Sequence, residues 1–193
     1  MGAALGEAEA RAKESLWAVL GAYLQRHVGE SSVVLDLACD RGYFIRNIRA
    51  VDRWATDVRD VSAELPKDVR FVQADSLELE TALPIGHFDR VFISNFLEHL
   101  PGPDVVVRQL EVVHRLLRSN GRVIILQPNI RLARGSYWDF IDHRVAQTER
   151  AFKRRPNSPQ PGASKTPTPP GAAGIMNERP TATTTSGPAK TGK

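Results

Sequence analysis

Three aspartates lie at or near the ends of three successive apolar runs and could together bind a nucleoside. Asp36 lies in the run Val33–Leu37, Asp57 ends the run 53–57, and Asp75 comes directly after a third run. A carboxylate at the end of a second strand can accept both hydroxyls of a ribose, and Asp75 could accept from an adenine amino group. Each aspartate alone could instead cap a helix or form a turn. Their shared position after the strands favours a nucleoside site.

The turn at residues 36–42 distinguishes between nucleoside cofactors. Its small residues precede a predicted helix, whose N-terminal N–H groups can bind a polar ligand. A dinucleotide site would need Gly-x-Gly-x-x-Gly, but the equivalent positions run from Ala38 to Gly42 with Asp40 between them. A carboxylate there would repel a pyrophosphate, and Asp36 suits a cationic amino group. The turn therefore favours a sulfonium nucleoside over the nicotinamide cofactor of an oxidoreductase.

The elements that must position these residues alternate between helix and strand. Apolar periodicity predicts a first helix over residues 5–28, whose apolar face should pack on a sheet. The remaining expected elements are strands at 33–37, 53–57, 69–74, 88–94 and 122–127, helices at 43–51, 58–65 and 103–118, and a last short helix opening at Thr148-Glu149. This order predicts an α/β fold with a doubly wound, mostly parallel sheet of about five strands and helices on both faces. Such sheets bind ligands beyond the carboxyl ends of their strands.

Five segments within residues 30–150 carry a family resemblance. They are Val33 to Phe44, Thr56-Asp57, Gln73 to Ser76, Phe88 to Leu100 and Leu117 to Val123. In this order they resemble the first motif (Asp-x-Gly-x-Gly-x-Gly), the ribose-binding strand end, the adenine-binding turn, the fourth-strand signature and the entry to strand five of class I S-adenosylmethionine-dependent methyltransferases. The segment Tyr137 to Arg144 is similar to the substrate-side loop of a bacterial small-molecule subgroup.

The resemblance implies a Rossmann-like fold with S-adenosylmethionine as cofactor. Carried onto this chain, the cofactor-binding residues would be Asp36, Ala38, Asp40, Gly42, Asp57, Asp75, Ser76 and Asn95. The implied reaction is transfer of a methyl group to an O, N or C nucleophile of an unidentified small molecule. No metal is implied.

A base is needed only when the acceptor must lose a proton. His143, in the substrate-side loop, and His99, after the fourth strand, are the candidate catalytic residues. Either could equally serve as an ordinary hydrogen-bonding residue. Tyr137 and Trp138 could line the acceptor pocket or pack on the sheet.

Two departures from the family pattern point to an alternative function. Ala38 and Asp40 replace two motif glycines, and Asp40 adds a Cβ and a charge where the backbone must approach the cofactor. The apolar pattern also stops near Phe152, where the family continues into a sixth and seventh strand. The fifth strand would then be an exposed sheet edge, able to pair with a second copy in a homodimer. The alternative is a truncated or degenerate, non-catalytic nucleoside-binding remnant.

Composition divides the chain into a folded domain at residues 1–155 and a disordered tail at 156–193. The tail holds 8 of the 13 prolines, 7 threonines and 5 glycines, against Ile175 and Met176 as its large apolar residues. It cannot bury enough surface to offset the entropy of ordering.

The charge distribution and the single cysteine limit the partners and the location. The chain carries a net charge of +4, but the tail accounts for +3, which leaves the folded part nearly neutral and argues against nucleic acid. Cys39 alone cannot form an internal disulfide, which fits a cytoplasmic location. Charged residues interrupt the N-terminal segment, so we expect neither a signal peptide nor a membrane partner.

Overall fold

The computed structural model describes the backbone of residues 2–153 and the side chains of residues 10–152. The tail predicted at 156–193 lies outside the described residues. The boundary at residue 155 therefore stays a prediction.

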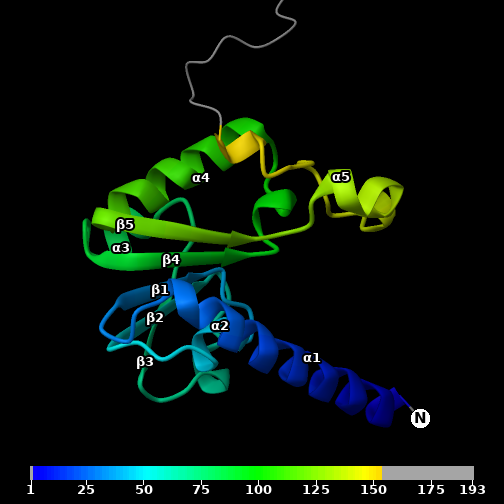
Figure 1. Cartoon of the computed structure of the whole chain (residues 1–193), viewed down its shortest axis with the longest axis horizontal. Helices are drawn as coiled ribbons and strands as arrows, with labels where there is room; N and C mark the ends of the chain where they lie inside the picture. The colour runs from blue at the N-terminus through cyan, green and yellow to red at the C-terminus, as the bar shows by residue number, and fades with distance from the viewer. Residues whose placement is uncertain (1, 154–193) are drawn as a thin grey trace, which may run out of the picture. The chain divides into compact units, whose positions relative to one another are not determined.

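A five-stranded parallel sheet forms the centre of the fold (Figure 1). Its strands are β1 (Val33–Leu37), β2 (Asp52–Asp57), β3 (Val69–Gln73), β4 (Phe88–Ser94) and β5 (Leu117–Leu126). Their spatial order is β3-β2-β1-β4-β5, and every neighbouring pair is parallel. The order reverses between β1 and β4, which makes the carboxyl ends of these strands the expected place for a ligand. The predicted doubly wound sheet is confirmed.

Side chains that alternate along β1 build two cores, one on each face of the sheet. Val34 packs with α1 (Gly2–Leu24) and α2 (Tyr43–Arg46), whereas Leu35 packs with α3 (Leu79–Ala82) and α4 (Pro103–Leu116). Each fully buried aliphatic side chain contributes about 1.5–3 kcal/mol. The helices thus cover both faces, as predicted.

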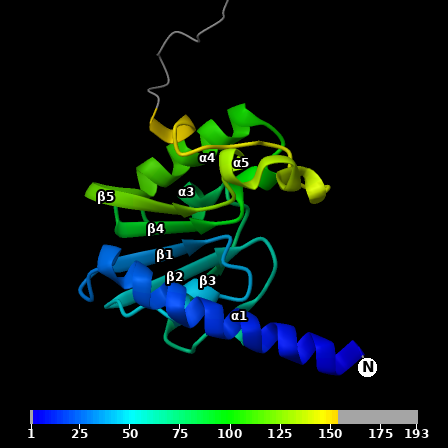
Figure 2. The same ribbon diagram turned by 45° about the vertical axis from the view of Figure 1, so that its right-hand side comes forward.

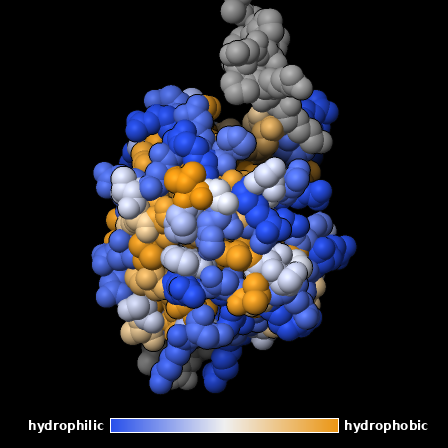
Figure 3. All heavy atoms as spheres, turned by 90° about the vertical axis from the view of Figure 1, so that its left-hand side faces the viewer, coloured by the Kyte–Doolittle hydropathy of each residue, from blue (hydrophilic) through white to orange (hydrophobic). Residues whose placement is uncertain are grey.

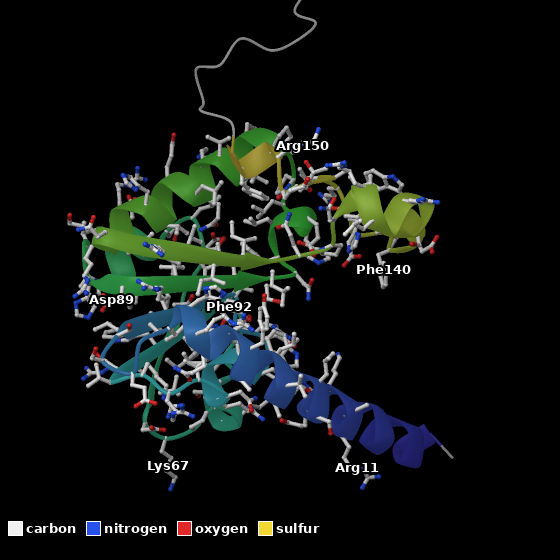
Figure 4. The ribbon with its side chains drawn as sticks, viewed as in Figure 1. Arg11, Lys67, Asp89, Phe92, Phe140 and Arg150 are labelled. Atoms are coloured by element: carbon white, nitrogen blue, oxygen red, sulfur yellow. The ribbon has the colours of Figure 1, made fainter. Side chains whose placement is uncertain are left out.

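An aromatic cluster joins the first helix to the sheet. The ring of Phe92, at the middle of β4 in Figure 4, stacks on Phe44 with centroids 3.7 Å apart, and Trp17 of α1 meets it edge-on at 6.2 Å. Only part of the predicted apolar face of α1 packs in this way. Leu16, Val19 and Tyr23 stay exposed, because the helix turns Trp17, Gly21 and Leu24 toward the sheet instead. The N-terminal part of α1 continues beyond the sheet (Figure 2).

Several connecting helices are shorter than the sequence predicts. The helix predicted at 43–51 ends at Arg46, and the one at 58–65 reduces to a 3-10 turn, η2 (Ser62–Glu64). The remaining short elements are η1 (Gln25–His27), η3 (Leu97–His99), α5 (Ile130–Ala133), η4 (Arg134–Asp139) and η5 (Ala151–Lys153). The first helix thus ends as η1, and the helix expected from Thr148 appears as η5.

The fifth strand begins earlier than residue 122, as a continuation of α4. Phe88 pairs with Leu117 but Arg90 pairs with Arg122, so the extra residues form a bulge in β5. Asn120 within it adopts a left-handed φ of 65°. Arg118 forms an ion pair with the buried Asp89, labelled in Figure 4. Asn120-Gly121, a pair typical of turns, therefore forms a bulge within the strand.

The segment after β5 lies at the carboxyl ends of the strands. In Figure 1 the arrowheads of β4 and β5 point toward the segment that contains α5 and η4. Figure 3 faces the opposite end, where hydrophilic and apolar side chains are intermixed. No helix among residues 2–153 is both long and apolar enough to cross a membrane.

Candidate functional site

The turn after β1 has the left-handed backbone conformation of a glycine-rich loop, even though two of the motif glycines are replaced. Ala38, Asp40 and Gly42 have φ values of 53°, 49° and 67°. Aspartate tolerates this left-handed region better than most residues do. Gly42 is the remaining glycine of the turn, and a Cβ there would lie 2.2 Å from Cδ2 at the end of the Leu65 side chain, which would have to shift.

Internal hydrogen bonds hold this turn against the next strand. The amide of Cys39 donates to the Thr56 carbonyl at 2.9 Å, and the amide of Asp40 donates to Oδ2 of Asp57 at 3.0 Å. The Gly42 amide donates to the carbonyl of Cys39 at 2.7 Å. These three amides are therefore used within the protein, and the turn offers a ligand its shape more than free N–H groups. Burial raises the pKa of the Cys39 thiol, which argues against a nucleophilic role.

A pocket of about 540 Å³ opens at the carboxyl ends of β1, β2, β3 and β4. Six of the eight predicted cofactor residues line it, namely Ala38, Asp40, Asp57, Asp75, Ser76 and Asn95. Apolar side chains complete the wall, among them Phe96, Leu100 and Val105. Its size is within the usual range for a site that holds a small molecule or cofactor.

Asp36 lies beneath this pocket rather than in its lining. Its side chain is buried, and Oδ2 has no hydrogen-bond partner among the described residues. Burial, opposed by a backbone hydrogen bond from Ile45 and assisted by the nearby carboxylates of Asp57 and Asp40, raises the pKa of Asp36 to about 8. Asp36 is thus mainly protonated at neutral pH, so its charge is not what would attract a cationic amino group.

Asp57 has the strongest set of hydrogen bonds in the pocket. Its side chain is 7% exposed, and its Oδ1 accepts from the amide of Arg59 at 3.0 Å and from Nε of Arg59 at 3.1 Å. Burial acts to raise the pKa of Asp57, but hydrogen bonds from Arg59 and from the Asp40 amide outweigh it and hold that pKa below its ordinary value. Asp57 is therefore ionised, as a carboxylate that accepts ribose hydroxyls must be.

Arg59 is a pocket residue that the sequence reasoning missed. Its guanidinium bridges two carboxylates, with Nη2 2.8 Å from Oδ1 of Asp40 and Nε 3.1 Å from Oδ1 of Asp57. It thereby compensates the charge that Asp40 adds to the motif. The sequence shows only that Arg59 comes two residues after Asp57. An ordinary surface arginine could occupy the same position, so the sequence does not mark Arg59 as a pocket residue.

The remaining predicted pocket residues are fixed by their own loops. Oδ1 of Asp75 accepts from the Leu77 amide at 2.8 Å, and the Ser76 carbonyl accepts from the buried Gln109 side chain at 3.0 Å. Asn95 has a left-handed φ of 45°, and its amide donates to the Leu126 carbonyl at 2.9 Å. The loops after β3 and β4 are thus held in place at the pocket rim.

Sequence comparison assigns this arrangement to a known family. The family model of the methyltransferase domain matches residues 28–125, slightly more than half of the chain. The chain belongs to the methyltransferase domain family. The match covers β1 to β5, which includes the turn at 36–42 and every predicted cofactor residue. No curated protein matches the chain.

Solved structures share the fold of this methyltransferase domain at low sequence identity. A SAM-dependent methyltransferase from Archaeoglobus fulgidus is 22% identical, with a TM-score of 0.59 over 71% of this chain and 65% of that one. A putative methyltransferase from Bacillus halodurans is 13% identical, with a TM-score of 0.55 over 70% and 64%. The chain therefore spans slightly less than two thirds of both. A Haloferax volcanii putative methyltransferase, solved with the Trm112 activator, is 15% identical, with a TM-score of 0.53 over 72% of each chain.

The two predicted catalytic histidines of the methyltransferase domain lie together but outside the pocket lining. The rings of His99 and His143 have centroids 5.1 Å apart, and the buried Glu98 adjoins them. Tyr137 is buried and packs on His143 instead of facing the pocket, whereas Trp138 is exposed. Glu98 was not identified from the sequence, because its burial depends on the later loop folding over η3.

Gly42 also lies outside the pocket lining. Its role is in the packing of the turn against Leu65.

Proposed function

We propose that this chain binds S-adenosylmethionine in the 540 Å³ pocket and transfers its methyl group to an O, N or C nucleophile of a small molecule. The observation that carries the proposal is the convergence of Asp57, Asp75 and the left-handed turn at 38–42 on one pocket of a methyltransferase domain. The residues present fit the cofactor, because carboxylates stand where hydroxyl and amino donors would lie. The sulfonium would supply an activated methyl group.

The chain's own residues would position the ligand. Asp57 would accept hydrogen bonds from the ribose hydroxyls once Arg59 moves away from part of the Asp57 carboxylate. Asp75 would accept a hydrogen bond from the adenine amino group. Phe96 and Leu100 would exclude water from the pocket wall. Correct placement of the two reactants can supply most of the rate enhancement in such a displacement. Where an acceptor must lose a proton, His143 and His99 are the proposed bases.

One observation supports the alternative of a non-catalytic nucleoside-binding remnant. Arg59 occupies the face of Asp57 that a ribose would need. An arginine that does not yield would block the cofactor. Binding of the cofactor is therefore the first question to test.

Calorimetric titration of the chain with S-adenosylmethionine, S-adenosylhomocysteine and NAD tests the proposal. We expect saturable binding of the first two and none of NAD. Asp57→Asn should weaken binding by about 10- to 100-fold, because a hydrogen bond to a charged group contributes about 1.5–3 kcal/mol. Glu111→Gln, an exposed carboxylate on α4, is the matched control and should leave binding unchanged. Absence of binding by the folded chain would favour the remnant.

The exposed edge of the sheet supports a separate proposal, a homodimer. Within the described residues, β5 is the last strand of the sheet and has no neighbour on its outer side. Light scattering coupled to gel filtration would decide it. A monomer at all concentrations would reject the homodimer.

A further inference from the structure

Three potential metal ligands converge beside the pocket, and two of them are the histidines proposed above as bases. Glu98 and His99 belong to η3, and His143 comes from the loop after η4. One ligand atom from each residue lies within 4.8 Å of the others, and Oε1 of Glu98 is 4.0 Å from Nε2 of His99. The adjoining residues Phe96 and Leu100 line the pocket.

The Glu98 carboxylate is buried without a partner. Its side chain is 1% exposed, and neither carboxylate oxygen has a hydrogen-bond partner among the described residues. Burying an ionised carboxylate is costly unless a cation or a set of donors compensates it. Its own backbone is well held, because the amides of Arg144 and Val145 donate to the Glu98 carbonyl at 2.8 and 3.1 Å. The unpartnered carboxylate oxygens of Glu98 therefore extend from a backbone that is held in place.

Hydrogen bonds on the outer nitrogens fix the tautomer of both histidines. Nδ1 of His143 lies 2.7 Å from the Tyr137 carbonyl, and Nδ1 of His99 lies 3.3 Å from the Asp142 carbonyl, with the carboxylate of Asp142 also 3.2 Å away. All of these partners are acceptors, so each Nδ1 carries the hydrogen and each neutral ring keeps its lone pair on Nε2. A metal-binding histidine typically has this arrangement, with its other ring nitrogen donating to a carbonyl or a carboxylate.

Packing holds the His143 imidazole in position. The ring of Phe140, labelled in Figure 4, stacks on it with centroids 5.1 Å apart. The buried Tyr137 lies on another side, and its hydroxyl donates to the Val145 carbonyl at 2.6 Å. The loop is therefore tied both to η3 and to itself, as a preorganised ligand set requires.

We propose that Glu98, His99 and His143 bind a divalent transition-metal ion such as Zn²⁺, through one carboxylate oxygen and the two Nε2 atoms. Two imidazoles and one carboxylate suit zinc or iron, whereas Mg²⁺ prefers oxygen ligands alone. Ligands bound at about 2.0–2.2 Å in a tetrahedron lie about 3.4 Å apart, so a closure of about 1 Å by side-chain rotation completes the site. Three protein ligands leave one position for water or another oxygen ligand.

This metal site is independent of cofactor binding, since none of its ligands lines the cofactor pocket. It does exclude one role assigned above, because a histidine bound to metal through Nε2 cannot take a proton there. The competing explanation is an internal ion pair between Glu98 and protonated histidines, which binds no metal.

Titration of the tag-free, metal-free full chain with Zn²⁺ tests the site, with Co²⁺ as a spectroscopic probe and Mg²⁺ as a negative control. We expect one Zn²⁺ per chain with micromolar or tighter affinity, and a visible Co²⁺ absorption typical of tetrahedral coordination. Glu98→Gln and His143→Ala should each weaken binding at least tenfold. His114→Ala, an exposed histidine on α4, is the matched control and should change nothing.

Two results would overturn the site: no saturable Zn²⁺ binding by the wild-type chain, or binding that Glu98→Gln and His143→Ala leave unaltered. Circular dichroism and thermal unfolding of the metal-free variants establish that each is folded. Glu98→Gln keeps the side-chain shape and removes a buried charge, so it provides a folded test if His143→Ala does not. The cofactor titration uses a different ligand and pocket, so either proposal can fail alone.

Discussion

The guanidinium of Arg59 lies against the carboxylate of Asp57, with Nε 3.1 Å from Oδ1 and Nη2 3.4 Å from Oδ2. Arg59 thus uses both oxygens of the side chain that would bind a ribose. The same guanidinium pairs with Asp40, which replaces a motif glycine. Arg59 would therefore compete with a ribose for the Asp57 carboxylate. Asp40 helps to hold Arg59 in this position.

Arg59→Ala should strengthen binding of S-adenosylmethionine. The substitution frees both oxygens of Asp57 and leaves Asp40 as an uncompensated negative charge in the pocket. A sulfonium cation gains from that charge while neutral S-adenosylhomocysteine does not, so we expect the preference for the former to rise severalfold. The side chain of Arg59 is 60% exposed but that of Asp57 is 7% exposed, so removal of the arginine should cost on the order of 1–3 kcal/mol of stability.

Calorimetry with both ligands measures the effect of Arg59→Ala. Arg41→Ala is the control, because Arg41 pairs with Glu64 outside the pocket lining. Weaker binding in Arg59→Ala would mean that the arginine itself contacts the ligand, and the competition described here would be incorrect.

Sequence periodicity predicted β1 and β4 well because each is a short apolar run largely buried on both faces. The bounds of β1 and β4 agree with prediction, and β2 and β3 differ by one residue at an end. The connecting helices were over-predicted, because apolar residues such as Val58 and Val61 occur in a short loop as easily as in a helix. The bulge in β5 was missed because Asn120-Gly121 is a turn signal that tertiary pairing with Phe88 absorbs into the strand.

For the candidate site, the sequence predicts the residues placed by the strands but not those whose roles depend on tertiary contacts. Aspartates at strand ends could be placed from the sequence, since strand polarity alone brings them to one edge. Arg59 could not, because its role depends on a side chain reaching back across the turn to Asp40. Glu98 could not either, because its burial is created by a loop more than 40 residues later in the chain.

Gly42→Ala should destabilise the fold by about 1–3 kcal/mol. The new Cβ would meet Leu65 at 2.2 Å, and the φ of 67° is unfavourable for alanine. Urea unfolding measures the change. Gly135→Ala is the matched control, because nothing lies within 4 Å of its Cβ position and its φ is not left-handed; we expect less than about 0.5 kcal/mol there. Equal effects of the two substitutions would contradict the assigned role of Gly42.

Tyr137→Phe should cost about 1–2 kcal/mol, because it leaves the Val145 carbonyl without its 2.6 Å hydrogen bond in a largely buried place. The ring itself is retained, so packing against His143 should persist. Urea unfolding compares it with Tyr23→Phe, whose ring is exposed on α1. A loss no greater than that of Tyr23→Phe would show that the hydroxyl does not hold the loop.

Asp36→Asn should change how stability depends on pH. The folded pKa of Asp36 is raised to about 8 by burial, whereas an unfolded aspartate titrates near about 3.9. Between these values the folded state binds more protons than the unfolded state, so the free energy of unfolding falls as pH rises from about 4 to 8. Asparagine cannot ionise, so the variant should lose this fall and gain on the order of a few kcal/mol relative to wild type at pH 8.

Urea unfolding at a series of pH values from 5 to 8.5 measures this difference for Asp36→Asn. Asp104→Asn, an exposed carboxylate on α4, is the control and should keep the wild-type slope. The comparison isolates Asp36, because Asp57 has a lowered pKa and its contribution to stability is complete above the unfolded value near about 3.9. A wild-type stability that stays flat over this range would show that burial does not raise the pKa of Asp36 in the folded protein.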